Sequence, residues 1–228
     1  MKRIAFFLEG QTECLFVERL LTEIAGEHQI TVVSRQASGS RGRRTIQLAA
    51  VTGTPYFALL VDCGADNTVA SDIRDYYNSL VAGGYTSIVG LRDVYPTARG
   101  DIPELQKQLY YKMRTVPVRP EVILAVMEVE AWFLADPGHL YRLLPGLTAT
   151  QVLTQLQLDL ATLAVETLDA PAATLDAIYR LVGRRYTKQR ARVQRLVKRL
   201  DFAELYFSAR GRVPSFGSLV TLIDDFLA

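Results

Sequence analysis

The chain has 228 residues, of which 49% are hydrophobic and 22% are charged, a composition typical of an ordinary globular protein. Its 26 Lys and Arg nearly balance its 24 Asp and Glu, and its two cysteines and two histidines are too few for a zinc ribbon or a disulfide framework, which favours a reducing cytoplasm. The apolar run after the basic residues 1–3 stops at Glu9, so we expect neither a signal peptide nor a membrane span.

The first elements in chain order are a predicted strand, a turn and a helix. Residues 4–8 form a short apolar run typical of a buried strand, and Glu9 follows it directly. Thr12 is a good helix N-cap, Glu13 in the first turn complements the helix dipole, and Gly26 is the expected helix end. Because open α/β sheets place their chemistry at the carboxyl ends of their strands, Glu9 is the first candidate functional residue.

Three later apolar runs repeat this arrangement of a strand followed by an acid. They cover residues 56–62, 86–93 and 122–130, and a further strand is expected at 30–33. Helices are predicted between them at 46–51, 72–81 and 104–113. Strands that are apolar throughout and alternate with helices indicate a mostly parallel sheet with helices on both faces.

The apolar periodicity becomes helical after Asp136 and stays helical to the last residues given. Amphipathic helices are predicted at 140–144, 148–156, 172–182, 190–200 and 218–227. We therefore predict an α/β domain over residues 1–136 and an all-helical extension over 137–228 that packs on it. Trp132, near the junction, is expected to anchor the two parts to each other.

Seven acidic residues at or near four strand ends carry the main functional hypothesis. They are Glu9, Glu13, Asp62, Asp66, Asp93, Glu128 and Glu130. Glu128 and Glu130 are two positions apart, so an extended backbone would turn both to one side. Mg²⁺ prefers such oxygen ligands, and two ions about 4 Å apart would clamp both oxygens of an in-line phosphoryl displacement. The alternative is that these residues are helix caps and solvated strand ends, although four successive strands ending on an acid are a rarer outcome of chance.

Two motifs carry a resemblance to a known fold. The segment LEGQTE at residues 8–13 resembles the first motif of the Toprim domain, the metal-binding fold of topoisomerases, bacterial primases and the nucleases of the overcoming-lysogenization-defect class. The segment LLVDCGAD at 59–66 stands where that fold has its second, Asp-containing motif. With VGLRDVYP and MEVEAWFLAD, the chain further resembles a prokaryotic Toprim-like family often encoded beside ATPases in mobile or defence loci. The resemblance covers about residues 1–140 and implies a Toprim-like, Rossmannoid α/β fold.

The Toprim resemblance also implies a function. It implies a phosphoryl-transfer site that depends on Mg²⁺ or Mn²⁺, and hence nuclease activity on DNA or RNA. By position, Glu9 would be the motif-one acid, acting as a metal ligand or general base, and Asp62 would be the motif-two metal ligand. The family further implies an ATPase partner and a role in phage defence.

The sequence departs from the Toprim pattern directly after Asp62. The second motif is usually Asp-x-Asp, but the residue two positions on is Gly64. Asp66 or Asp93 would therefore have to supply the missing acid. The departure leaves two alternatives open. One is a catalytically inactive module that binds nucleic acid or a protein partner, and the other is a doubly wound domain in which Glu9 and Asp93 contact a small polar molecule in a closed pocket.

Basic residues are segregated along the chain. Residues 121–178 carry one Lys or Arg against eight acids, whereas 179–212 carry eleven against two. The Gly- and Arg-rich loop at 38–44 and the basic tract at 180–199 are both expected to bind phosphate backbones. The candidate nucleic-acid-binding residues are Arg41, Arg43, Arg44, Arg184, Arg185, Lys188 and Arg192. The alternative for the tract is a solvated helix face or ion pairs with the acidic segment before it, and the alternative for the loop is a flexible surface loop.

Overall fold

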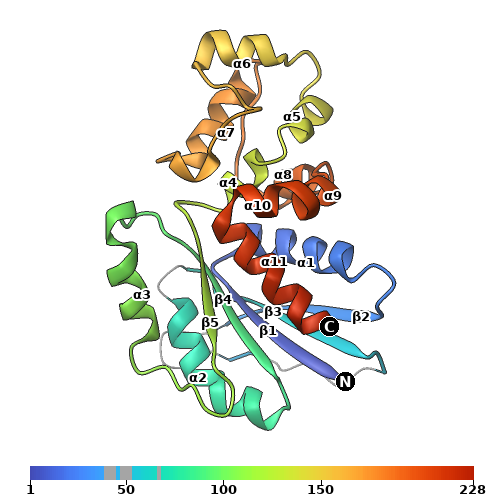
Figure 1. Cartoon of the computed structure of the whole chain (residues 1–228), viewed down its shortest axis with the longest axis vertical. Helices are drawn as coiled ribbons and strands as arrows, with labels where there is room; N and C mark the ends of the chain where they lie inside the picture. Colours follow the sequence, from blue (N-terminus) through green and yellow to red (C-terminus); the bar gives the residue numbers. More distant parts are fainter. Residues whose placement is uncertain (39–44, 47–52, 66–67) are drawn as a thin grey trace.

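The computed structural model describes residues 1–38, 45–46, 53–65 and 68–228, and it has an α/β fold with helices on both faces of a parallel sheet (Figure 1). Five parallel strands form the sheet within those residues: β1 (Lys2–Leu8), β2 (Ile30–Gln36), β3 (Tyr56–Asp62), β4 (Ser87–Asp93) and β5 (Glu121–Ala125). Their order across the sheet is β2-β3-β1-β4-β5. The predicted parallel α/β fold is therefore confirmed.

The helices fall into two groups along the chain. Those between the strands are α1 (Gln11–Ala25), α2 (Val69–Ala82) and α3 (Ile102–Tyr110), with a short 3₁₀ turn η2 (Arg99–Asp101). Those after the sheet are α4 (Glu130–Leu134), α5 (Gly138–Leu143), α6 (Ala149–Leu156), η3 (Val165–Thr167), α7 (Pro171–Arg180), α8 (Arg190–Val197), α9 (Phe202–Glu204), the π-helical turn η4 (Leu205–Ala209), α10 (Arg210–Arg212) and α11 (Pro214–Leu227).

Side chains from β1 are buried on both faces of the sheet. Ile4, Phe6 and Leu8 pack into one core cluster, and Ala5 and Phe7 pack into the other. Because alternate residues of a strand point to opposite faces, a strand covered on both sides must be apolar throughout. This explains the unbroken apolar runs of the sequence.

The face of the sheet that carries α1 is also covered by α11, which packs on β5 and α1 (Figure 1). The centre of this layer is Trp132, whose ring centroid lies 5.9 Å from that of Phe16 and 5.5 Å from that of Phe216. The Trp132 Nε1–H also donates a hydrogen bond of 2.9 Å to Ser215 Oγ. Trp132 therefore joins the sheet layer to the C-terminal helices, as expected.

The helical part beyond residue 136 divides into two regions. In Figure 1, α5, α6 and α7 stand beyond the end of the sheet, whereas α11 returns to lie along its face. The Tyr56 hydroxyl on β3 donates a hydrogen bond of 2.7 Å to the carbonyl of Leu227 at the end of α11. Helix α11 thus shares its core with the sheet. No helix in the described part of the chain is long and apolar enough to cross a membrane.

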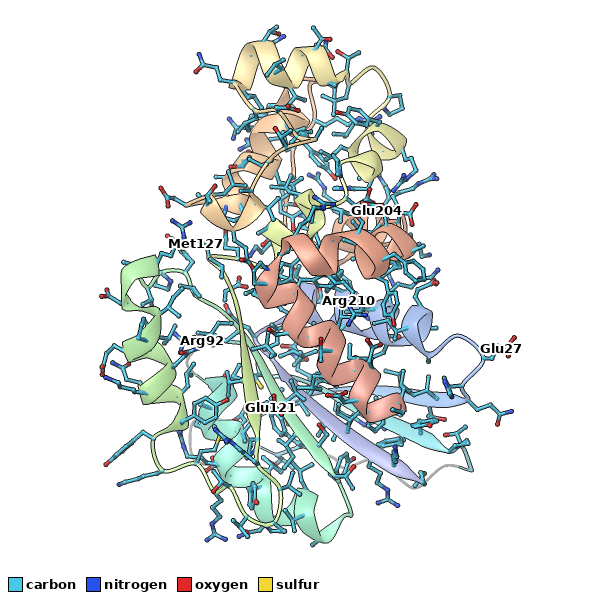
Figure 2. All side chains as sticks on the ribbon, in the orientation of Figure 1. Glu27, Arg92, Glu121, Met127, Glu204 and Arg210 are labelled. Atoms are coloured by element: carbon cyan, nitrogen blue, oxygen red, sulfur yellow. The ribbon has the colours of Figure 1, made fainter. Side chains whose placement is uncertain are left out.

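Some element ends differ from those predicted. Gly10, and not Thr12, is the N-cap of α1, and Thr12 is buried inside its first turn. Strand β5 ends at Ala125 because the chain turns at Met127, whose φ is 63° and which lies where the sheet meets the helical region (Figure 2). The helix predicted at 46–51 falls almost entirely outside the described residues.

Candidate metal centre

The strand order creates a switch point at the carboxyl edge of the sheet. After β1 the chain passes through α1 toward β2, and after the neighbouring β4 it passes through α3 toward β5. Helices α1 and α3 pack into the core clusters of opposite faces. Open α/β sheets bind ligands outside the strand ends at such a point. Glu9 follows β1 and Asp93 ends β4, so these two acids flank the switch point.

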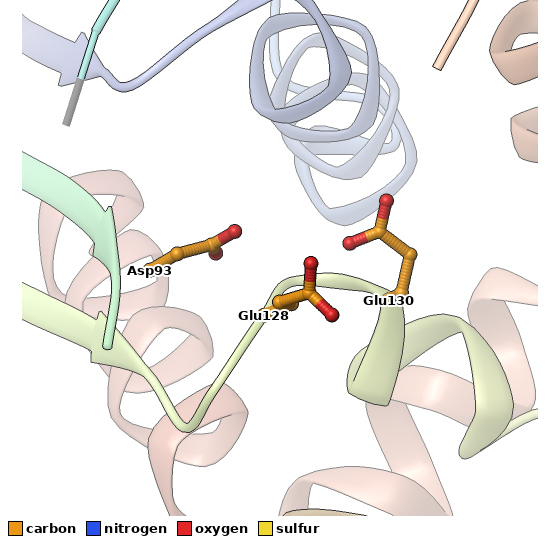
Figure 3. A group of neighbouring side chains, drawn as sticks. All are labelled: Asp93, Glu128 and Glu130. Carbon is orange, nitrogen blue, oxygen red and sulfur yellow. The ribbon is translucent and has the colours of Figure 1, made fainter. Parts of the chain in front are cut away.

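Three carboxylates converge beside this switch point. Asp93, Glu128 and Glu130 each offer an oxygen atom, and these atoms all lie within 4.8 Å of one another (Figure 3). Asp93 and Glu130 are buried, and Glu128 is half-buried. Oxygen ligands at such spacing are what hard divalent cations require. The three residues could therefore hold a metal ion.

A turn after β5 positions the last two acids. Met127 turns the chain through its positive φ, and the Val129 N–H then donates a hydrogen bond of 2.9 Å to Asp93 Oδ1. Glu130 is the first residue of α4. The expectation that an extended backbone turns Glu128 and Glu130 to one side is therefore wrong, since a turn and a helix start bring them together.

The carboxylates are held by partners from α7 and the segment after it. Glu128 Oε2 accepts a hydrogen bond of 2.9 Å from the Ala172 N–H, and Glu130 Oε1 accepts one of 2.7 Å from the Tyr186 hydroxyl. The ammonium of Lys188 lies 3.6 Å from Glu128 Oε1 and 3.3 Å from Glu130 Oε1. Glu130 Oε2 is buried and has no hydrogen-bond partner among the described residues. A buried oxygen left unsatisfied is costly, and a cation is one group that would satisfy it.

Burial and mutual repulsion favour the protonated forms of these acids. Burial, with repulsion from Glu13, Glu9 and Glu130, raises the pKa of Asp93 well above its ordinary value. Burial is also the main cause that raises the pKa of Glu130, and it raises the pKa of Glu13 to about 7. A bound divalent cation would act in the opposite direction, because it stabilises ionised carboxylates.

Lys188 responds to the same charges. Burial opposes its positive charge, but the carboxylates of Glu130, Asp93 and Glu128 outweigh this effect and raise the pKa of Lys188. The lysine is therefore charged at neutral pH and belongs to the acidic centre. This corresponds to the alternative in which the basic tract pairs with the acidic segment before it.

The other predicted ligands that the structure describes are not members of this group. Within the described ranges, the set of three or more acids able to share an ion consists of Asp93, Glu128 and Glu130 and does not include Glu9, Glu13 or Asp62.

The positions of two of these acids follow from the sheet. The Glu9 carboxylate accepts a hydrogen bond of 2.9 Å from the Asp93 N–H, so it supports the end of β4. Asp62 ends β3, and its Oδ1 accepts a hydrogen bond of 2.9 Å from the Gly64 N–H. Because β1 lies between β3 and β4, those two strands are separated by about 10 Å, twice the usual strand spacing. Asp66 lies outside the described residues.

The predicted nucleic-acid-binding residues have varied surroundings. Arg184 Nη1 donates a hydrogen bond of 3.3 Å to the Leu143 carbonyl, and Arg185 lies 3.8 Å from Asp176. Arg192 Nη1 donates a hydrogen bond of 3.1 Å to the Arg185 carbonyl. These three arginines line a hollow next to the acidic centre. The remaining candidates, Arg41, Arg43 and Arg44, lie outside the described residues.

The fold and the site together define a parallel α/β protein with a buried, metal-competent group of carboxylates at the carboxyl edge of its sheet. A scan against protein-family models, a search of curated proteins and a search of solved structures each found no match to this chain.

Proposed function

We propose that this protein is a Mg²⁺-dependent hydrolase that cleaves phosphodiester bonds of DNA or RNA. The observation that carries the proposal is the convergence of Asp93, Glu128 and Glu130, together with the buried and unpartnered Oε2 of Glu130. Mg²⁺ takes one or two carboxylates and completes its shell with water and substrate phosphate, and Mn²⁺ suits the same oxygen ligands. The resemblance of LEGQTE to the first Toprim motif supports the same chemistry, and it is the sole support for an ATPase partner and a role in phage defence.

In this proposal the residues of the chain have distinct tasks. Asp93 and Glu130 hold the ion, with Glu128 as the third ligand. Glu9 fixes the end of β4 through its hydrogen bond to the Asp93 N–H. Lys188 offers its ammonium to the negative charge of the phosphate. The chemistry supplied by a bound Mg²⁺ is polarisation of the phosphate and acidification of a water molecule.

The direct test is cleavage by the purified chain. Supercoiled plasmid, linear duplex, single-stranded DNA and RNA are incubated with the protein in Mg²⁺, Mn²⁺ or EDTA. We expect metal-dependent cutting by the wild type, and loss of it in Asp93→Asn and Glu130→Gln. Glu204→Gln, which removes an exposed acid of α9, should cut normally. If the wild type cuts none of these substrates, also when an ATPase encoded beside it is added, the proposal is wrong.

A second candidate is a module that binds nucleic acid or a protein partner without catalysis. The observation that favours it is that Ala172, Tyr186 and Lys188 already engage two of the three carboxylates. Gly64, at the position of the second motif-two acid, points the same way. Stabilisation of the wild type by Mn²⁺, lost in Asp93→Asn and without cleavage of any substrate, would favour this candidate.

A further inference from the structure

A basic hollow lies beside the acidic centre. Its volume is about 680 Å³, within the usual range for small-ligand sites. Four guanidinium groups line it, and none of its lining residues within the described chain is acidic. They belong to Arg184, Arg185, Arg192 and Arg195.

The guanidinium groups of this basic hollow retain donors for a ligand. All four side chains are exposed, and Arg195 makes no hydrogen bond or ion pair with the residues that the structure describes. Arg184 and Arg192 each use one nitrogen on a backbone carbonyl, which leaves their other N–H groups available. Arg185 is partly neutralised, because it forms an ion pair with Asp176, which also pairs with Arg180. The hollow is therefore a concentration of incompletely neutralised positive charge.

The basic hollow and the acidic centre share one wall. Tyr186 and Thr187 line the hollow, while the Tyr186 hydroxyl binds Glu130 and the next residue, Lys188, contacts Glu128 and Glu130. Thr187 Oγ1 is buried in this wall without a hydrogen-bond partner among the described residues. A polyanion with one phosphate at the carboxylates therefore has its next phosphates beside the hollow.

We infer that the basic hollow binds a phosphoryl group of a nucleic-acid strand, adjacent to the phosphate at the acidic centre; this rests on the proposed function. The guanidinium fork matches phosphate oxygens in a bidentate manner, and arginines at this density neutralise backbone charge. The same chemistry would accept the phosphate of a free nucleotide. The strand is the assigned source because residues 186–188 form a wall shared by the hollow and the acidic centre, so that neighbouring phosphates of one strand can reach both.

The test is binding without cleavage. A fluorescently labelled single-stranded oligonucleotide is titrated with protein in EDTA at several salt concentrations. We compare the wild type with the double variant Arg192→Gln/Arg195→Gln. We expect weaker binding by the variant, and a salt slope of log Kd smaller by about 1.4, since each phosphate contact on a single strand contributes about 0.7.

The matched control removes the same charge far from the hollow. Lys112→Gln/Arg119→Gln changes two exposed cations that precede β5, at the end of the sheet opposite the site. This control should bind as the wild type does. Because all four replaced side chains are exposed, both variants should keep the wild-type melting temperature. The single variant Arg195→Gln, whose side chain makes no hydrogen bond or ion pair with the described residues, repeats the test at half the charge change.

Two outcomes would overturn the inference. One is oligonucleotide binding that is equal in the wild type and the Arg192→Gln/Arg195→Gln variant. The other is binding of adenosine monophosphate, but not of the oligonucleotide, through these arginines, which would assign the hollow to free nucleotides. A protein that binds the strand through the hollow but never cuts it contradicts the proposed hydrolysis and leaves this site intact.

Discussion

The ammonium of Lys188 lies 3.3 Å from Glu130 Oε1 and 3.6 Å from Glu128 Oε1. It supplies one positive charge to a group of carboxylates that also includes Asp93. A divalent cation at these carboxylates would share the same oxygens and would meet repulsion from the ammonium. Lys188 should therefore stabilise the metal-free protein and weaken metal binding.

The first prediction concerns Lys188→Met. In EDTA we expect a loss of about 1 kcal/mol in stability, reduced by solvent screening because 46% of the lysine side chain is exposed. In Mn²⁺ we expect a larger rise in melting temperature than for the wild type, because the competing charge is gone. Thermal unfolding over a Mn²⁺ titration measures both effects. Lys188→Arg, which keeps the charge, should behave as the wild type does, and a smaller rise for Lys188→Met contradicts the prediction.

The second prediction concerns the pH dependence of stability through Glu13. Burial is the main cause that raises the pKa of Glu13 from about 4.5 to about 7, with added repulsion from Glu130 and Glu9. Between these values the unfolded chain has released the proton that the folded chain still holds. The contribution of Glu13 to the free energy of unfolding is therefore fully present below pH 4.5. It is lost as the pH rises toward 7, by on the order of 3 kcal/mol.

Glu13→Gln removes this titration. We expect the variant to gain stability relative to the wild type as the pH rises from 4.5 to 7.5, measured by urea unfolding in EDTA. Glu204→Gln, which changes an exposed acid, should follow the wild-type pH profile. Parallel profiles for Glu13→Gln and the wild type would contradict the prediction.

The sheet was predictable because its signals are local. Strands β1, β3, β4 and β5 are short runs whose residues are largely buried on both faces, as for residues 4–8, so neither their apolar character nor their ends depend on distant parts of the chain. The edge strand β2 is the exception, since its residues are half-buried or exposed. The strand-end acids Asp93, Glu128 and Glu130 followed from the same pattern, and the structure brings these three together. What could not be predicted is which acids meet.

The composition of the centre depends on features that are not local. The order β3-β1-β4 separates Asp62 from Asp93. The pattern of apolar residues in the sequence does not predict strand order. Lys188 is 58 residues beyond Glu130 in sequence, and its assignment to nucleic acid rested on charge density alone. The sequence carried one signal for this contact, because the basic tract follows an acidic segment and ion pairs between the two were the alternative to nucleic-acid binding.

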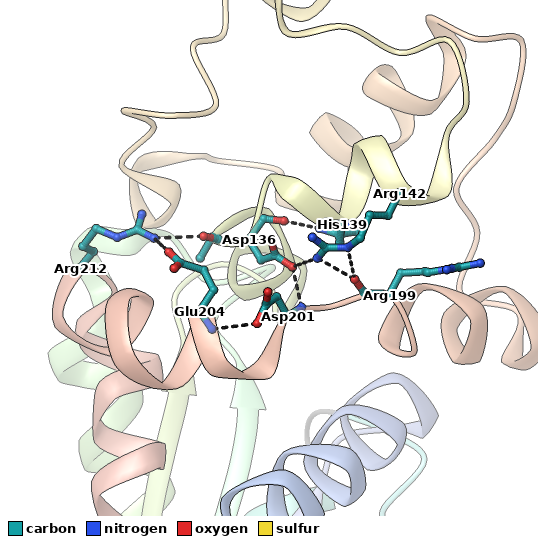
Figure 4. Close-up of polar contacts among 8 residues, drawn as sticks. Asp136, His139, Arg142, Arg199, Asp201, Glu204 and Arg212 are labelled. Atoms are coloured by element: carbon teal, nitrogen blue, oxygen red, sulfur yellow. Dashed lines mark hydrogen bonds and ion pairs between the residues drawn. The ribbon is translucent and has the colours of Figure 1, made fainter.

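The third prediction concerns Asp136, which joins three parts of the helical region (Figure 4). Its buried Oδ2 accepts hydrogen bonds of 2.7 Å from Arg142 Nη2 and from the Asp201 N–H. Arg142 in turn donates to the Arg199 carbonyl at 3.0 and 2.8 Å. Asp136→Ala should cost about 2–4 kcal/mol, because it leaves the Arg142 guanidinium and the partly buried Asp201 N–H without this acceptor.

Urea unfolding of Asp136→Ala against a matched exposed pair tests this third prediction. Glu204 lies 3.2 Å from Arg212, and both side chains are more than 40% exposed. Glu204→Ala should therefore cost less than about 1 kcal/mol. Equal costs for the two variants would mean that the Asp136 contacts add nothing to stability beyond those of an exposed pair.

The last prediction compares two glycines on either side of the corner between α10 and α11. A Cβ at Gly217 would collide with the Arg210 carbonyl oxygen, a backbone atom that cannot rotate away, whereas a Cβ at Gly211 meets nothing within 4 Å. Alanine is favoured over glycine in helices by about 1 kcal/mol. Gly211→Ala should therefore raise stability by about 0.5–1 kcal/mol, and Gly217→Ala should lower it by about 1–3 kcal/mol through overpacking. Urea unfolding of both variants measures the difference, and a stabilising Gly217→Ala would show that α11 does not need this close approach to lie along the sheet.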